Sequence, residues 1–169
     1  MKQIIIVFAL LCCAYNQPLM AQNKSLQSRF NQSLNHYYAL KNALAADEPA
    51  EAAKLSTALL RSVKKVPHTG FASEVQHKLW MEESAKITQQ CIKLGSTSDL
   101  KSQRKNFEQI SAAFIRLTGE LKLNETPAFV QYCPMGKNSW LNEVKTVQNP
   151  YYGLTMPDCG AVKETIVKN

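Results

Sequence analysis

The sequence predicts an all-α protein, an up-and-down four-helix bundle with a C-terminal tail, irregular or a short β-hairpin, docked on it. Two observations carry this prediction. Between residues 25 and 121, apolar residues recur every three or four positions in four runs joined by short connections, as in antiparallel helix bundles. After Pro127 the pattern becomes strand-like and rich in turn residues. The 169 residues, 45% hydrophobic and 20% charged, fit one globular domain.

The first 21 residues are predicted to be a signal peptide, and residues 22–169 a single domain. Lys2 supplies a positive charge, the apolar run Ile4 to Ala14 follows, and Leu19-Met20-Ala21 provides a cleavage site. The apolar run is too short to span a bilayer. We therefore expect a periplasmic or secreted protein with no transmembrane segment after signal cleavage.

The five cysteines fall into two groups. Cys12 and Cys13 lie in the predicted signal peptide, and acylation of one of them, as in a lipoprotein, is a weaker alternative because neither follows a small residue. Cys91, Cys133 and Cys159 remain after cleavage. An odd number in an oxidising compartment implies a free thiol or a bond to another chain. Cys91 is the candidate free thiol because it falls on an apolar helical stripe.

Two helices are expected first, from Ser25 to Ala46 and from about Pro49 to Val66. The apolar stripe of the first consists of Leu26, Phe30, Leu34, Tyr37 and Leu44. Asp47 is expected to cap the second helix, Glu48 suits its dipole, and Pro49 fits its first turn. The buried face of the second should comprise Ala52, Leu55, Leu59, Val63 and Val66, and Pro67 to Gly70 should end it.

Two more helices follow. A capping box of Ser73 and Gln76 should begin the third, which should end near Leu94 with Gly95 just after it. Its inner face is expected to comprise Val75, Leu79, Trp80, Ile87, Cys91 and Leu94. Ser98 or Asp99 should cap the fourth helix, and Gly119 near its end should let it fray. The apolar stripe of the fourth consists of Leu100, Phe107, Ile110, Phe114, Leu117 and Leu121.

The charges and the histidines favour neither nucleic-acid binding nor catalysis. The formal net charge of +7 comes from scattered Lys and Arg, and the densest groups, Arg61–Lys65 and Lys101–Lys105, hold no aromatic residues. Both groups are expected to be solvated helix faces. His36 and His77 are expected at the surface, and His68 in a loop without a partner. No paired carboxylate or activated nucleophile is evident, so we do not expect an enzyme.

The tail after Pro127 is too small to fold alone, so it should dock on the bundle. Ala128 to Tyr132 has strand composition, Trp140 to Val147 is a candidate second short strand, and Asn149-Pro150 with Gly153 marks turns. The aromatic residues expected to pack on the helices are Phe129, Tyr132, Trp140, Tyr151 and Tyr152. Such docking would bring the two ends of the tail together.

Two thiols and two thioethers form the one chemical constellation in the sequence. Cys133 and Met135 stand at the start of the tail motif, and Met156 and Cys159 at its end. A set of sulfur donors suits soft ions, with Cu(I) the first candidate. The alternative is a disulfide between Cys133 and Cys159, with both methionines as packing residues. The sequence leaves both open.

Two regions carry distinctive motifs. They are Tyr37–Asp47 and, in the tail, Val130–Met135, Trp140-Leu141, Asn149–Gly153, Met156, Cys159-Gly160 and Val162–Thr165. Both regions resemble a family of exported bacterial domains of unknown function. Similar domains occur alone and fused to membrane-fusion adaptors of heavy-metal efflux pumps of the copper/silver type. The Cys-Pro-Met element also resembles the Tyr-x-Cys-Pro-Met motif of small heavy-metal-binding domains in such adaptors. The resemblance implies the ligand set Cys133, Met135, Met156 and Cys159.

These observations together predict a periplasmic protein that binds Cu(I) or Ag(I) through a motif within residues 128–160. It would deliver the metal to an efflux system or regulate one, with an efflux adaptor or another envelope protein as partner and no nucleic acid. The alternative is a helical protein-interaction domain of the cell envelope, stapled by a disulfide between Cys133 and Cys159.

Overall fold

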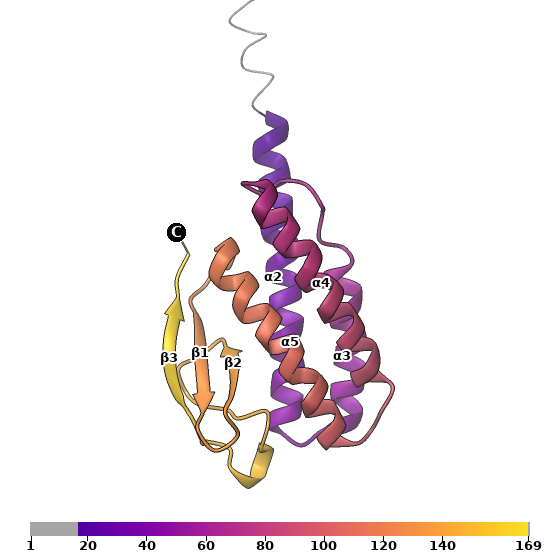
Figure 1. Cartoon of the computed structure of the whole chain (residues 1–169), viewed down its shortest axis with the longest axis vertical. Coiled ribbons are helices and arrows are strands. Elements are labelled where there is room, and N and C mark those ends of the chain that lie inside the picture. Colours follow the sequence, from indigo (N-terminus) through magenta and orange to yellow (C-terminus); the bar gives the residue numbers. More distant parts are fainter. Residues whose placement is uncertain (1–16, 169) are drawn as a thin grey trace, which may run out of the picture.

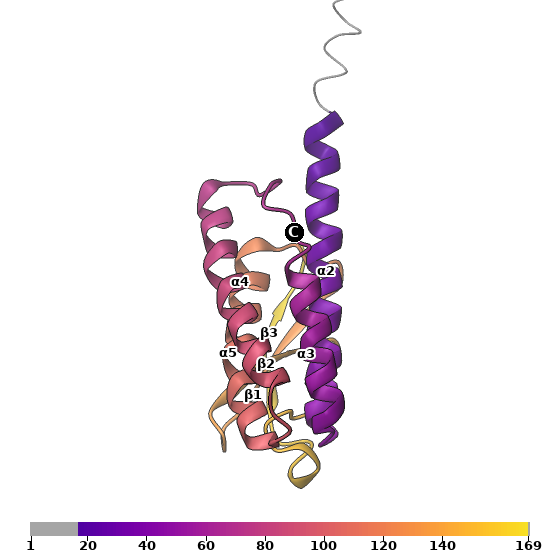
Figure 2. The same ribbon diagram turned by 90° about the vertical axis from the view of Figure 1, so that its right-hand side faces the viewer.

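Four helices stand side by side with neighbours antiparallel, and a small sheet covers one side of them (Figures 1 and 2). The structure is a computed structural model that describes residues 17–168, with side chains from residue 23. The helices are α2 (Gln17–Ala45), α3 (Pro49–Val63), α4 (Glu74–Gly95) and α5 (Leu100–Leu121). The apolar run of the predicted signal peptide, with Cys12 and Cys13, lies outside the described residues.

The tail is a sheet rather than a hairpin, so the all-α prediction is imprecise. Its strands are β1 (Ala128–Cys133), β2 (Asn138–Asn142) and β3 (Ala161–Ile166), antiparallel in the order β2-β1-β3, with a 3₁₀ turn η1 (Gly153–Thr155) before β3. Val130 pairs with Leu141 of β2 and Ala128 with Ile166 of β3. The second strand was expected over Trp140 to Val147 but begins two residues earlier and ends at Asn142.

Two helices have other bounds than predicted: α2 begins at Gln17 rather than Ser25, and α3 ends at Val63 rather than Val66. Among the other predicted helix ends, two caps are confirmed and three details are wrong. The Ser73 hydroxyl accepts from Gln76 N at 3.2 Å and the Asp99 carboxylate accepts from Ser102 N at 2.8 Å, as predicted. Asp47, however, does not cap α3: its φ is 58° and Glu48 takes the cap position. Gly95 is the last residue of α4 and Ser96 the cap, and α5 continues past Gly119 to Leu121 without fraying.

Val75 was assigned to the inner face of α4 but is 78% exposed. The buried residues of this helix are Leu79, Trp80, Glu83, Ile87, Cys91 and Leu94, so its buried face begins one turn after Val75. The buried Glu83 on this face is paired with Arg116 at 2.7 Å and Lys86 at 2.9 Å.

A row of aromatic rings joins the tail to the bundle. The Tyr37 ring lies 4.8 Å from that of Phe114 and 5.5 Å from that of Phe107, and Tyr151 continues the row from Phe107 to Trp140 at centroid distances of 5.8 and 5.9 Å. Such contacts add to the apolar burial that drives docking. Two of the five aromatic residues expected to dock do otherwise: Phe129 and Tyr132 lie beside the ammonium groups of Lys145 and Lys163.

Polar groups at this interface are also satisfied across it. The Tyr37 hydroxyl accepts a hydrogen bond from Leu141 N at 3.0 Å and bonds Ser111 at 2.8 Å, so one side chain links α2, α5 and β2. The fully buried Lys41 ammonium donates to Asn142 at 2.6 Å and lies 3.3 Å from Glu143. Leaving such groups unpaired in a core is costly, so these bonds fix one position of the tail on the helices.

Cys91 is 1% exposed in the α4 stripe, as predicted, and burial raises the pKa of its thiol to about 12. The thiolate is the reactive form. We therefore expect a maleimide to label Cys91 in the folded protein at pH 8 at least about a hundredfold more slowly than in urea, where the pKa is normal. Peptide mapping by mass spectrometry gives both rates, and equal rates would show that the residue is not in a closed core.

Candidate functional site

The fold brings Cys133 and Cys159 together. Cys133 is the last residue of β1, and Cys159 stands two residues before β3, which pairs with β1 through Tyr132 and Ala161. The two Sγ atoms lie 2.8 Å apart, and both residues are free thiols. Cys133 is buried and Cys159 is half-buried. The strand pairing therefore places the two thiols in contact although 26 residues separate them in sequence.

The turn from β1 to β2 stabilises a thiolate at Cys133. Burial raises the pKa of the Cys133 thiol, but the hydrogen bonds it accepts from Cys159, from the N–H groups of Gly136 and Met135, and from Asn149 outweigh burial and lower it overall. The bond that Cys159 donates, its own desolvation and the negative charge at Cys133 raise the pKa of Cys159. When the pair loses one proton, the negative charge therefore lies on Cys133 and the remaining proton stays on Cys159.

Asn149 organises the segment that leads to Cys159. Its amide nitrogen donates to Cys159 O at 2.8 Å, and its amide oxygen accepts from the backbone N–H groups of Tyr151 and Tyr152 at 2.9 and 3.2 Å. Its own N–H donates to Pro157 O at 2.9 Å. This is the Asx turn that an Asn before Pro favours. One buried side chain thus ties both ends of the segment 149–159 to each other.

Two glycines let the tail close over this segment. Gly160, with φ at 151°, follows Cys159, and a Cβ there would lie 3.0 Å from the Trp140 ring. Gly153, with φ at 54°, lies where a Cβ would overlap the Asp47 carboxylate. That carboxylate pairs with Arg104 of α5 and accepts from Leu154 N at 3.1 Å. These positions therefore accept only glycine.

The two methionines of the predicted ligand set occupy different settings. Met135 lies in the β1–β2 turn with 69% of its surface exposed, so its thioether extends into solvent. Met156 follows η1 and is half-buried, and its carbonyl accepts from Cys159 N at 3.3 Å. The structure thus brings the thiols together and leaves the exposed thioether free to approach from the turn.

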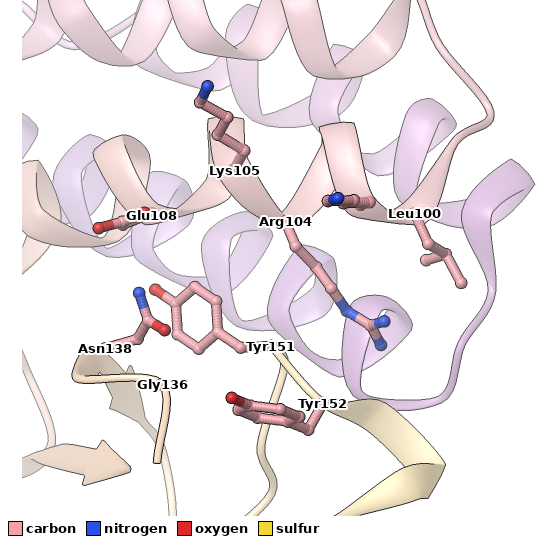
Figure 3. A pocket seen from close by; sticks show the side chains of 9 residues that line it. Leu100, Arg104, Lys105, Glu108, Gly136, Asn138, Tyr151 and Tyr152 are labelled. Atoms are coloured by element: carbon pink, nitrogen blue, oxygen red, sulfur yellow. The ribbon is translucent and has the colours of Figure 1, made fainter. Parts of the chain in front are cut away.

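An open pocket of about 600 Å³ lies beside this turn, between α5 and the tail (Figure 3). Gly136, which donates to the Cys133 sulfur, lines it together with Asn138, Tyr151 and Tyr152. Arg104 reaches from α5 toward the tail and donates to Pro150 O at 2.8 Å, whereas Lys105 points away (Figure 3). Arg104 therefore serves to hold the tail, and the pocket gives solvent access to the turn.

The geometry of the thiol pair allows two reactions. Two sulfurs on one ion at about 2.3 Å each would stand about 3.8 Å apart at a tetrahedral angle and about 4.6 Å apart if collinear, so metal binding needs the observed 2.8 Å to widen. A disulfide needs the same atoms to close to about 2.05 Å. Within residues 17–168, no group of three or more His, Cys, Asp and Glu side chains could hold a metal ion.

Comparison with known proteins places the helical part in a family. Residues 34–126, more than half of the chain, match the family described as "Protein of unknown function (DUF3347)". The chain belongs to this family. No curated protein and no solved structure matches the chain.

The DUF3347 match covers α2 from Leu34, all of α3 to α5, and the connection that follows, and it ends two residues before β1. The thiol pair therefore lies in the tail beyond the matched region, although Asp47 and Arg104, which hold that tail, lie within it. Within the part of the chain that the structure describes, no helix has both the length and the apolar character needed to cross a membrane.

Sequence reasoning missed several residues of the site. The role of Asn149 was visible only as an Asn-Pro turn signal, and Gly136 and the Met135 N–H act through the backbone, which carries no side-chain signature. Arg104 was assigned to a solvated basic face, yet it pairs with Asp47 and donates to Leu44 O and Pro150 O. An Asp just after one helix and an Arg on another give no signal of pairing without the fold.

Proposed function

We propose that this protein binds Cu(I) or Ag(I) through the thiols of Cys133 and Cys159, with the thioethers of Met135 and Met156 as further ligands. The proposal includes a periplasmic location and transfer of the ion to, or regulation of, a metal efflux system through an adaptor or another envelope protein. The observation that carries it is the contact of the two thiols, one of them with a lowered pKa, at the end of a preorganised turn.

Thiolate and thioether donors are the soft ligands that select Cu(I). The N–H groups of Met135 and Gly136 stabilise negative charge on Cys133 before any ion arrives, which lowers the cost of deprotonating it. Met135 lies in the turn next to that sulfur and is exposed, so its thioether could bind an ion as the ion enters or leaves the site. Exchange of one such ligand at a time is how a carrier would pass the ion to a partner.

The second candidate function is a helical interaction domain whose tail is stapled by a disulfide between Cys133 and Cys159. The observation that favours it is the sulfur separation of 2.8 Å, which is shorter than a shared ion requires. In this case the two cysteines would only stabilise the fold, and the tail surface around Tyr151 and Tyr152 would contact the partner protein.

A Cu(I) titration separates the two functions. In the reduced full chain with Cys12 and Cys13 replaced by Ser, we expect the thiol pair to bind one Cu(I) tightly enough to compete with a high-affinity chromogenic chelator, which measures this binding. Cys133→Ser should remove most of this binding, because one thiolate donor is lost, and Met135→Leu should weaken it less. Affinity should fall as pH falls, because Cys159, whose pKa is raised, must lose its proton.

The outcomes of this titration are distinct. Equal uptake of Cu(I) by the reduced protein and by its Cys133→Ser variant would end the metal proposal. Uptake that appears only after reduction of a protein purified without free thiols at both positions would show that the staple is the resting state. The Cys91 thiol is present in every variant and is buried, so it contributes the same background throughout.

A further inference from the structure

A second group of metal-ligating side chains lies away from the thiol pair, where the loop after α3 meets the start of α4. The imidazole rings of His68 in this loop and His77 in α4 are edge-to-face, with centroids 6.3 Å apart. Met81 stands four residues after His77, on the same helix face. Met81 and His68 both line an open cleft of about 460 Å³ between α3 and α4. In Figure 1 this loop lies toward the end of the molecule opposite the tip of β1.

The loop that carries His68 is held in place on both sides. Before it, Val66 is 2% exposed and belongs to the core. After it, the Phe71 ring packs on Trp80 at 6.3 Å and on His77 at 5.5 Å. Anchors on both sides limit the freedom of His68, so the two imidazoles face each other without help from a bound ligand. A preorganised ligand pair loses less entropy when an ion binds.

His77 carries a polar atom that the protein itself does not satisfy. The expectation that this residue is solvated is wrong: its Nε2 is buried and has no hydrogen-bond partner among the described residues. Buried polar atoms are nearly always paired, and each exception calls for an explanation, of which a site for an ion is one. The nitrogen that lacks a partner belongs to the same ring that faces His68.

The distance between the two rings lies within the range for two imidazoles on one ion. With metal–nitrogen bonds of about 2.0–2.1 Å, the ring centroids of two ligands stand about 5–6.5 Å apart for angles between tetrahedral and linear, and the observed separation is 6.3 Å. Imidazole and thioether donors both suit copper, and thioether favours its monovalent state.

The charges around the cleft favour a monovalent ion. Its lining, which includes His68 and Met81, has one charged side chain, Lys64, and no carboxylate, so the cleft itself offers an ion no negative charge. An uncompensated divalent ion would be harder to desolvate there than a monovalent one. We infer that His68, His77 and Met81 form a second soft-metal site that takes a monovalent ion, Cu(I) or Ag(I). This site does not depend on the thiol pair.

The test uses Ag(I), which is redox-inert, in chloride-free buffer. In the full chain with Cys12, Cys13, Cys133 and Cys159 all replaced by Ser, we expect calorimetry to show one Ag(I) bound per chain. We expect the imidazole nitrogen resonances of His68 and His77 to shift together in NMR spectra as Ag(I) is added, while those of His36 stay fixed. This second measurement needs no change in the site, so it holds even where a histidine variant folds poorly.

Variants in the same background complete the test. The double variant His68→Asn, His77→Asn should bind Ag(I) at least about 10–100-fold more weakly, since loss of supporting groups alone costs that much at metal sites. Met81→Leu, which keeps the side-chain size, should weaken binding less. The matched control, His36→Asn on α2, should bind as the background does. Failure of the background protein to bind Ag(I), or equal binding by the double variant, would overturn the inference.

Discussion

Replacing Trp140 with Ala should lower the free energy of unfolding by about 3–5 kcal/mol, the usual loss for a large buried aromatic side chain. Trp140 is fully buried in β2, and its ring packs edge-to-face on Tyr151 and against Gly160. Removing the ring leaves a cavity between the sheet and α5, at the end of the aromatic row that joins the tail to the bundle. Urea denaturation followed by circular dichroism measures the change.

Two matched variants show whether the loss reflects docking of the tail. Trp140→Phe keeps an aromatic ring beside Tyr151 and should lose less than the Ala variant. Leu154→Ala removes an apolar side chain from the same tail, but one that is 69% exposed, so its effect should stay within about 0.5 kcal/mol. A Trp140→Ala protein that unfolds at the same urea concentration as the parent would show that the tail contributes little to stability, contrary to the burial observed.

The helical part could be predicted because local rules decide it. Caps such as Ser73 and Asp99 are recognised from two residues each, and apolar stripes reveal which face of a helix is buried. The failures occur where a long-range contact overrides the local preference. Asp47 would suit a cap, but its carboxylate is used by Arg104 of α5 and by Leu154 N, and the backbone adopts a positive φ to reach them.

The third strand, β3, could not be predicted because its residues do not alternate between buried and exposed positions. From Ala161 to Thr165 every residue of β3 is exposed, and only Ile166 is buried. An edge strand that exposes both faces shows neither alternation nor an apolar run, which are the signals for strands. The same strand positions Cys159, so the paired sulfur motif suggests that the two thiols approach each other, but only the strand pairing establishes it.

The candidate site, too, could be predicted only in part from the sequence. The residue types Cys133 and Cys159 indicate soft-metal or disulfide chemistry from sequence, because few other roles need paired thiols in one short tail. The lowered pKa of Cys133 depends on backbone N–H groups and on Asn149, and neither can be assigned without coordinates. The buried Nε2 of His77 likewise lacks a hydrogen-bond partner only in the folded structure, and no sequence pattern around a single His indicates this.

Oxidation of the thiol pair should raise the free energy of unfolding by about 3–4 kcal/mol over the reduced protein, because a bond between residues 26 apart removes loop-closure entropy from the unfolded chain. The sulfurs are already in contact, so the bond should form within one chain. Urea denaturation of the diamide-treated and the reduced chain, both with Cys12 and Cys13 replaced by Ser, measures the difference, and a thiol count confirms oxidation. Cys159→Ser, treated identically, should show no shift. Complete oxidation to a monomer without any gain in stability would mean that the unfolded chain already holds these residues together. In either case the oxidised protein should no longer take up Cu(I) at this pair, because a disulfide offers no thiolate.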